Sequence, residues 1–151
     1  MNIVETTHDD PRTQTLIALQ KAHASEHTPP KLGHAFEVGS ENAARARFFL
    51  AISDGLPVGC VGLMALDDRA AEIKTMHVLE EMRGRGTGMV LLHHVFAVAK
   101  AEGVHQLKLE TGSGDGFAAS RRLYERAGFE HCAPWGAYTD DPFSYCMARD
   151  V

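Results

Sequence analysis

The sequence predicts an α/β fold in which a mixed sheet carries helices on both faces. Three observations predict it. Several apolar runs have the composition of strands, other apolar residues recur at helical spacing, and turns rich in Gly, Asp or Pro separate the two kinds of segment. With 151 residues the chain is long enough to bury a hydrophobic core, and we expect a single domain over residues 1–151.

The first half of the chain is expected to contribute four strands and one helix. "NIVET" is a short first strand, and Asp10 followed by Pro11 begins a helix of about 14 residues. Residues 27–44 are rich in proline and glycine and are expected to form a loop. The apolar runs "RFFLAIS" and "VGCVGLMAL" flank an Asp-Gly turn and predict a hairpin, and "AEIKTMHV" adds a third strand to this meander.

The second half is expected to alternate helices with strands. Apolar residues at helical spacing predict a helix from Gly86 to Glu102, which Gly103 ends. The strand "HQLKLET", a helix from 117 to 127 and the strand "FSYCMAR" follow. Only the segment from "AEIKTMHV" through the helix to "HQLKLET" has the form of a βαβ crossover, so these two strands should be parallel.

Composition excludes several classes of function. The 15 basic and 20 acidic residues give a net charge of −5, which argues against nucleic-acid binding through a basic surface. No apolar stretch of about 18 residues exists, so we expect no membrane span. The N-terminus lacks the layout of a signal peptide, and three widely spaced cysteines suit a reducing compartment. We therefore expect a cytoplasmic protein.

The stretch "MRGRGTG" has the composition of an anion-binding loop. It stands between a predicted strand and a predicted helix, and the N-terminus of a helix offers unpaired N–H groups and a partial positive charge. Two known phosphate-binding loops do not fit. Met89 occupies the position of the third glycine of a dinucleotide-binding motif, and no lysine follows Gly88 as a P-loop requires. A glycine-rich turn that binds nothing is the alternative.

Arg83, Gly86 and Gly88 fill the pattern R-x-x-G-x-G, which resembles the acetyl-CoA loop of the GNAT superfamily of N-acetyltransferases. "AEIKTMHV" is similar to the fourth strand of that family, and "LYERAGF" is similar to its last helix. The resemblance covers the chain from about Val58 to the C-terminus. It implies a mostly antiparallel sheet with one splayed parallel pair of strands. It also implies that acetyl-CoA is the co-substrate, bound by the backbone of Met76, His77 and Val78 and by the loop residues Arg83, Gly84, Arg85, Gly86, Thr87 and Gly88.

The reaction that the resemblance implies is direct transfer of an acetyl group to an amine, which needs a base and an acid. An alkyl amine with a pKa near 10.4 is almost wholly protonated at neutral pH, so its proton must first be removed. Glu72 matches the glutamate that is the base in histone-type members. A solvated strand glutamate, or one paired with Lys74, is the alternative, and Glu110 and His77 are second choices. Tyr124 matches the family's general acid, with a packing tyrosine as the alternative.

The remaining candidate residues have weaker functional signals. Phe117 replaces an amide residue that many family members use to hold the cofactor. His23 and His27 have a helical spacing that suits a metal, but a third ligand is missing, so we expect solvated side chains and no metal.

The variable segments, Pro11–Ala44 and Trp135–Ser144, are expected to bind the acceptor. Asp140 and Asp141 in the second of them favour a small cationic amine or amino compound. An exposed last strand would allow a homodimer. The rival functions are a non-catalytic CoA-binding or sensor domain and an unrelated nucleotide-phosphate binder.

Overall fold

A computed structural model of the chain describes residues 1–27 and 45–151, so the loop expected over residues 27–44 lies outside the described part except for His27. In chain order the elements are β1 (Asn2–Thr7), α1 (Pro11–His27), β2 (Arg47–Ser53), β3 (Leu56–Ala65), β4 (Ala70–Val78), η2 (Glu80–Met82), α4 (Thr87–Ala101), β5 (Gln106–Gly112), η3 (Asp115–Phe117), α5 (Ala118–Arg126), β6 (Glu130–His131) and β7 (Ser144–Asp150). Every predicted strand and helix is present, and β6 is an addition.

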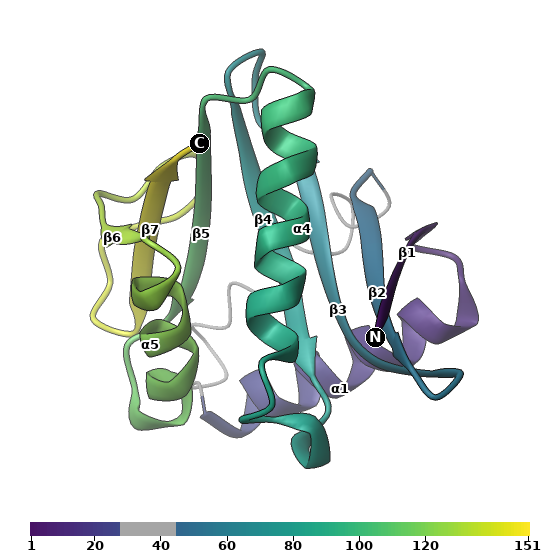
Figure 1. Cartoon of the computed structure of the whole chain (residues 1–151). Coiled ribbons are helices and arrows are strands. Elements are labelled where there is room, and N and C mark those ends of the chain that lie inside the picture. The colour runs from purple at the N-terminus through teal and green to yellow at the C-terminus, as the bar shows by residue number, and fades with distance from the viewer. Residues whose placement is uncertain (28–44) are drawn as a thin grey trace.

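Within the described residues, seven strands form one sheet in the order β1-β2-β3-β4-β5-β7-β6 (Figure 1). Neighbouring strands are antiparallel except β4 and β5, which are parallel, as the single βαβ crossover predicted. Their pairing covers only three residue pairs and ends at Glu72 and Lys108. Beyond that point the two strands diverge toward Val78 and Gly112, which is the splayed pair that the family resemblance implied (Figure 1).

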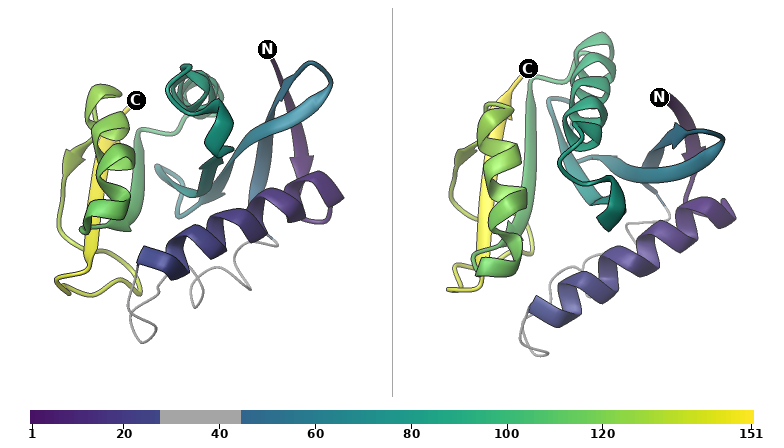
Figure 2. Two further views of the ribbon diagram at one scale, coloured as in Figure 1. Left: turned by 90° about the horizontal axis from the view of Figure 1, so that it is seen from below. Right: turned by 60° about the horizontal axis from the view of Figure 1, so that its bottom comes forward.

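Helices cover both faces of the sheet, as the sequence predicted. α4 and α5 lie on one face and α1 lies across the other (Figure 2). Phe49 and Leu50 are consecutive on β2 and therefore point to opposite faces. Phe49 joins the core cluster of Leu92 on α4, and Leu50 packs against Leu16 of α1. Among the helices of residues 1–27 and 45–151, none combines the length and hydropathy that a membrane crossing requires.

The ends of the helices follow the local signals in the sequence. Asp10 precedes Pro11, and its carboxylate accepts the backbone N–H of Arg12 at 2.9 Å in the first turn of α1. α4 and α5 each end at a glycine in the left-handed region, Gly103 with φ 78° and Gly128 with φ 92°. The N–H that follows each glycine bonds to the carbonyl five residues earlier, which is the Schellman arrangement. These signals fix the directions in which the chain leaves its helices.

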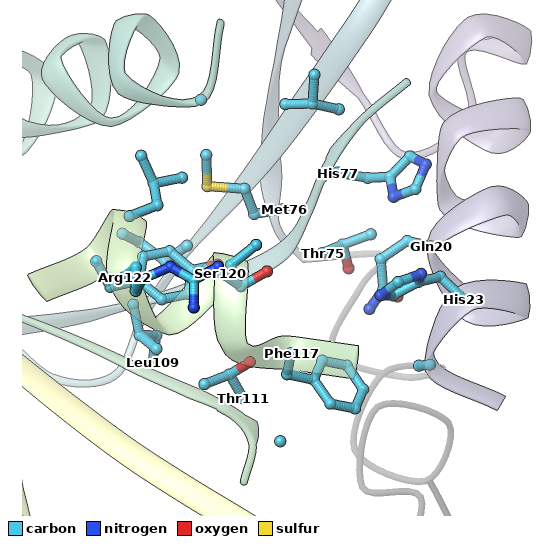
Figure 3. Close-up of a pocket in the computed structure, with 18 of the residues that line it drawn as sticks. Gln20, His23, Thr75, Met76, His77, Leu109, Thr111, Phe117, Ser120 and Arg122 are labelled. Carbon is cyan, nitrogen blue, oxygen red and sulfur yellow. The ribbon is translucent and has the colours of Figure 1, made fainter. Parts of the chain in front are cut away.

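A bulge in β4 interrupts the pairing with β3. The register shifts between Cys60 and Gly62, and Thr75 on the opposite strand has a φ of 51°, which is uncommon for a residue other than glycine. The Cys60 thiol donates to the Thr75 carbonyl at 3.4 Å. Because one extra residue is inserted, the alternation of side chains reverses after Thr75. His77 therefore faces α1, while Met76 packs on the α4 side (Figure 3).

The expectation of an exposed last strand is wrong. β7 lies between β5 and β6, and Glu130 and His131 of β6 pair with Ala148 and Met147 of β7. The residues that form β6 directly follow the turn after α5, and a run of two residues is too short to show a strand pattern in the sequence. The expectation of a homodimer depended on an exposed edge at β7, and β6 covers that edge.

Candidate functional site

A cavity of about 670 Å³ opens where β4 and β5 separate. Its walls come from α1, from the diverging ends of β4 and β5, from the first turn of α4, and from η3 and α5 (Figure 3). Gln20 and His23 of α1 face Thr75 and His77 of β4, while Ser120 and Arg122 approach from α5 (Figure 3). The volume is within the range of pockets that bind small molecules.

The loop before α4 has the open backbone that an anion site needs. Gly84 and Gly86 have φ values of 74° and 86°, and a Cβ on either would meet no atom within 4 Å. The first helical bond runs from the Val90 N–H to the Gly86 carbonyl, so the preceding amides have no acceptor within the helix. The Thr87 hydroxyl is buried and has no hydrogen-bond partner among the described residues. These groups fit the diphosphate of a CoA thioester.

Gly88 has a different role from the other two glycines. A Cβ at this position would lie 2.7 Å from Leu123 and 3.4 Å from Met76. The residue is buried in the first turn of α4, so its lack of a side chain lets this turn approach Leu123 of α5 and the strand β4. Gly88 therefore shapes the wall of the cavity through packing.

Positive charge lies beside the loop, although its source differs in part from the expectation. Arg83 lines the cavity, and its Nε donates to the Val78 carbonyl at 3.1 Å. Arg122 and Arg126 of α5 line the cavity too, whereas Arg85 is exposed and is not among the lining residues. Among the predicted cofactor-binding residues, Arg85 is thus the one that the structure places outside the cavity.

The edge of β4 that faces the gap carries the other predicted cofactor contacts. Met76, His77 and Val78 line the cavity, and β4 has no ladder pair with β5 beyond Glu72. An unpaired strand edge offers backbone N–H and C=O groups to a ligand. The structure therefore places the predicted residues where backbone bonds to a cofactor arm are available.

Glu72 is buried and paired. Its side chain lines the cavity with 3% of the residue exposed, so the alternative of a solvated strand glutamate is wrong. Its Oε2 accepts the Tyr138 hydroxyl at 2.5 Å and lies 3.4 Å from Lys74 Nζ. Burial raises the pKa of Tyr138 above its usual range, and the Glu72 carboxylate raises it further. The contact with Tyr138 joins residues 66 positions apart, and no local sequence pattern predicts it.

Tyr124 and Glu110 stand at the same opening. Tyr124 lines the cavity from α5, and its ring meets Phe129 edge-on at 5.9 Å. Burial raises the pKa of Tyr124 above its usual range, and the negative charge of Glu110 raises it further. A phenol in this position keeps its proton at neutral pH. Glu110 also lines the cavity and accepts the Ser144 hydroxyl at 3.1 Å.

Phe117 closes the end of the cavity near α1. A Cβ at Gly112 would lie 2.2 Å from the Phe117 ring, so the lack of a side chain at this glycine permits the close approach of Phe117 to β5. His23 meets the ring edge-on at 5.6 Å, and its Nε2 lies 3.2 Å from the Gly116 carbonyl. His23 is therefore a half-buried residue of the cavity and not the solvated side chain expected. Its nearest histidine, His27, is 4.6 Å away between ring centroids, and the described residues contain no group of three metal-ligating side chains.

The acidic pair expected near the acceptor does not reach the cavity. Tyr138 and Phe143 line it, but Asp140 and Asp141 do not. Asp140 is exposed, and the carboxylate of Asp141 accepts the backbone N–H of Phe143 at 2.8 Å. The sequence argument for a cationic acceptor thus lacks the contact on which it depended.

His77 makes the stability of the fold sensitive to mild acid. Burial, followed by the positive charge of Arg83, lowers the pKa of His77 to about 4. The folded pKa is below the unfolded value near 6.5, so between these values the unfolded chain binds more protons. We expect the contribution of His77 to the free energy of unfolding to be complete above about pH 6.5. As the pH falls to about 4, the free energy of unfolding should decrease by ~1–3 kcal/mol. Urea unfolding of the wild type and of His77→Gln across this range measures the difference, and parallel curves would contradict it.

Comparison with known proteins gives a consistent result. The acetyltransferase (GNAT) family model matches residues 14–129. The uncharacterized N-acetyltransferases YedL of Escherichia coli and YsnE of Bacillus subtilis are each 32% identical to the chain, over 89% and 95% of its length and 84% and 97% of theirs. A GNAT family acetyltransferase from Elizabethkingia anophelis, solved with acetyl-CoA bound, matches in fold with a TM-score of 0.74 and 21% identity, covering 99% of this chain and 97% of that one.

Proposed function

Because this chain belongs to the GNAT family of acetyltransferases, we propose that it moves the acetyl group of acetyl-CoA directly to a primary amine of a small molecule. One observation carries this proposal. A buried carboxylate, Glu72, and a buried phenol, Tyr124, line one cavity at the point where two strands separate beside an anion-binding loop. Transfer from a thioester to an amine requires a base for the amine proton and an acid for the leaving sulfur, both within one cavity.

The cofactor is proposed to lie between β4 and β5 with its diphosphate at the loop. The amides of the first turn of α4 and the Thr87 hydroxyl are the polar groups there that lack acceptors or partners within the described fold. Arg83, Arg122 and Arg126 add positive charge along the same wall. Local charge of this kind allows a protein with a net charge of −5 to bind an anionic cofactor.

When bound, acetyl-CoA supplies the thioester carbonyl as the electrophile. Glu72 takes the proton from the attacking amine as the new C–N bond forms, directly or through a water. Tyr124 gives its phenolic proton to the sulfur as the C–S bond breaks. Lys74 and the Tyr138 hydroxyl hold the Glu72 carboxylate in the cavity wall.

Direct transfer is favoured because no cysteine is placed to carry the acetyl group. The three cysteines all lie in the described part of the chain, and none of them lines the cavity. Burial raises the pKa of Cys60 to about 12 and the pKa of Cys146 to about 11. A thiol held in its protonated form is a weak nucleophile.

Release of free CoA in the presence of a panel of amines tests the proposal. Turnover with at least one amine is expected, together with tight binding of acetyl-CoA in a calorimetric titration. Binding of acetyl-CoA without turnover on any amine would favour a non-catalytic CoA-binding or sensor domain. Tighter binding of ATP or NAD than of acetyl-CoA would favour the nucleotide binder.

Gly86→Ala tests the loop separately from the chemistry. An alanine at a φ of 86° costs about 1–2 kcal/mol, and a loop that relaxes to another backbone conformation must recover this one to bind the cofactor. We expect the Kd for acetyl-CoA to rise roughly 5- to 30-fold. Gly103→Ala is the matched control, because its φ is 78° and a Cβ there also meets open space, but it lies at the far end of α4. Equal Kd values for the two variants would contradict the assignment of the loop.

A further inference from the structure

Lys74 is a buried cation inside the cavity. The residue is 9% exposed and lines the cavity one position before the bulge of β4. Its Nζ has no hydrogen-bond partner among the described residues and lies 3.4 Å from Glu72 Oε2. Lysine side chains are almost never fully buried without a partner, because a desolvated ammonium that makes no hydrogen bond costs free energy. A ligand oxygen in the cavity would supply the acceptor that this side chain lacks.

Glu72 does not use up the hydrogen-bonding capacity of Lys74. The oxygen of Glu72 that faces Lys74 is the same one that accepts the short bond from the Tyr138 hydroxyl. An ammonium group has three donors and can bind this oxygen with only one of them. At least two N–H groups of Lys74 therefore have no acceptor among the described residues.

We propose that Lys74 binds a carboxylate on the acceptor, and that the acceptor is an α-amino acid or a close relative of one. This inference rests on the proposed acetyl transfer. Glu72 and Lys74 carry opposite charges, stand two residues apart on one strand and face the same cavity. An α-amino acid carries its ammonium and its carboxylate on one carbon atom. Its two charges can therefore meet Glu72 and Lys74 together, which a simple amine cannot do.

The surroundings of the pair indicate the kind of amino acid. The aromatic side chains of Phe117, Tyr138 and Phe143 line the same cavity. The acidic residues of the segment that was expected to bind the acceptor, Asp140 and Asp141, lie outside the cavity. They therefore do not compete with a ligand carboxylate for Lys74. We infer an acceptor with an apolar or aromatic side chain. When Glu72 accepts the proton of the amine, Lys74 still holds the carboxylate, so the acceptor stays in place during transfer.

The test compares L-phenylalanine with 2-phenylethylamine, which lacks only the carboxylate, and with L-phenylalaninamide, which keeps its size without its charge. We expect kcat/KM for CoA release to be about 10- to 100-fold higher for L-phenylalanine, the range given by a hydrogen bond to a charged group. The difference should lie mainly in KM. Calorimetric titration of the same three compounds into the protein saturated with CoA should show the same order of affinity.

Variants of Lys74 separate its charge from its bulk. Lys74→Met should abolish the preference for the carboxylate and leave the Kd for acetyl-CoA unchanged, while Lys74→Arg should retain the preference. Lys108→Met is the matched control, because Lys108 lies on the neighbouring strand, with its Nζ 5.4 Å from the Trp135 ring, and does not line the cavity. Preference for the two compounds without a carboxylate in the wild type, or a preference for the carboxylate that survives in Lys74→Met, would overturn the inference.

Failure of this inference is distinguishable from failure of the proposed function. CoA release with amines that shows no preference for the carboxylate removes the role of Lys74 and leaves acetyl transfer intact. Absence of release with every amine removes acetyl transfer. In that case the calorimetric comparison still decides whether the cavity prefers a carboxylate.

Discussion

Tyr124→Phe is expected to lower kcat for CoA release by about 10²–10⁴-fold, the usual contribution of a positioned general acid. The variant removes one hydroxyl and keeps the ring that packs edge-on against Phe129. Burial and the charge of Glu110 raise the pKa of Tyr124, so the wild-type hydroxyl holds its proton at neutral pH. Because the hydroxyl acts on the leaving sulfur, the Kd for acetyl-CoA should change little. Steady-state kinetics with a saturating amine, beside calorimetry with acetyl-CoA, measure the two quantities.

Tyr145→Phe is the control for this experiment. Tyr145 is a half-buried tyrosine of β7 that packs against His131 at 4.5 Å and does not line the cavity. It should lose no activity, while thermal unfolding should show both variants to be folded. Unchanged turnover of Tyr124→Phe would leave Tyr124 with a packing role only.

Glu72→Gln is expected to lower kcat/KM by about 10²–10⁴-fold at neutral pH and to recover as the pH rises. Without the base, the variant depends on amine that is already neutral, and that fraction grows tenfold per pH unit below the amine pKa near 10.4. A pH–rate profile from pH 7 to 10 therefore separates a catalytic role from a structural one. A loss of activity that stays constant across this range would show that Glu72 only supports the fold.

Glu72→Gln also lowers the free energy of unfolding, which must be measured together with the kinetics. Glu72→Gln leaves the buried ammonium of Lys74 without its counter-charge, and breaking one side of a buried pair costs about 3–5 kcal/mol. The double variant Glu72→Gln/Lys74→Gln removes both charges and should recover part of that loss. Glu110→Gln keeps the pair intact and tests the second-choice base, which the Ser144 hydroxyl contacts.

Most of the fold was predictable because its elements carry local signals. The strand from Arg47 to Ser53 was predicted with the bounds that the structure shows, since the Asp-Gly turn after it is a strong hairpin signal. The glycines that end α4 and α5 are local signals too. β6 was missed because its two residues are a strand only through their pairing with β7. The bulge at Thr75 was missed because no residue there favours a positive φ.

The candidate site was predictable where it depends on the backbone and less so where it depends on side chains. The anion-binding character of the loop before α4 follows from its position between a strand and a helix. The role of the edge of β4 was expected only from the resemblance to the GNAT family. The contact between Glu72 and Tyr138 depends on how a distant segment crosses the sheet, which no local pattern contains. The burial of Lys74 has the same origin, and lysine is among the residues that a sequence argument places on the surface. Arg83 and Arg85 were both expected to contact the cofactor because of their places in the motif, but only Arg83 lines the cavity.

The early end of the pairing between β4 and β5 has a consequence for what the protein admits. A sheet normally has its free edges at the rim, where charged residues or short strands prevent other chains from adding to them. Here two free edges face each other in the middle of the sheet, with α4 and α5 on one side and α1 on the other. An extended molecule with its own donors and acceptors can pair with these edges as a strand would. The gap thus offers recognition by backbone hydrogen bonds in addition to the side chains that line the cavity.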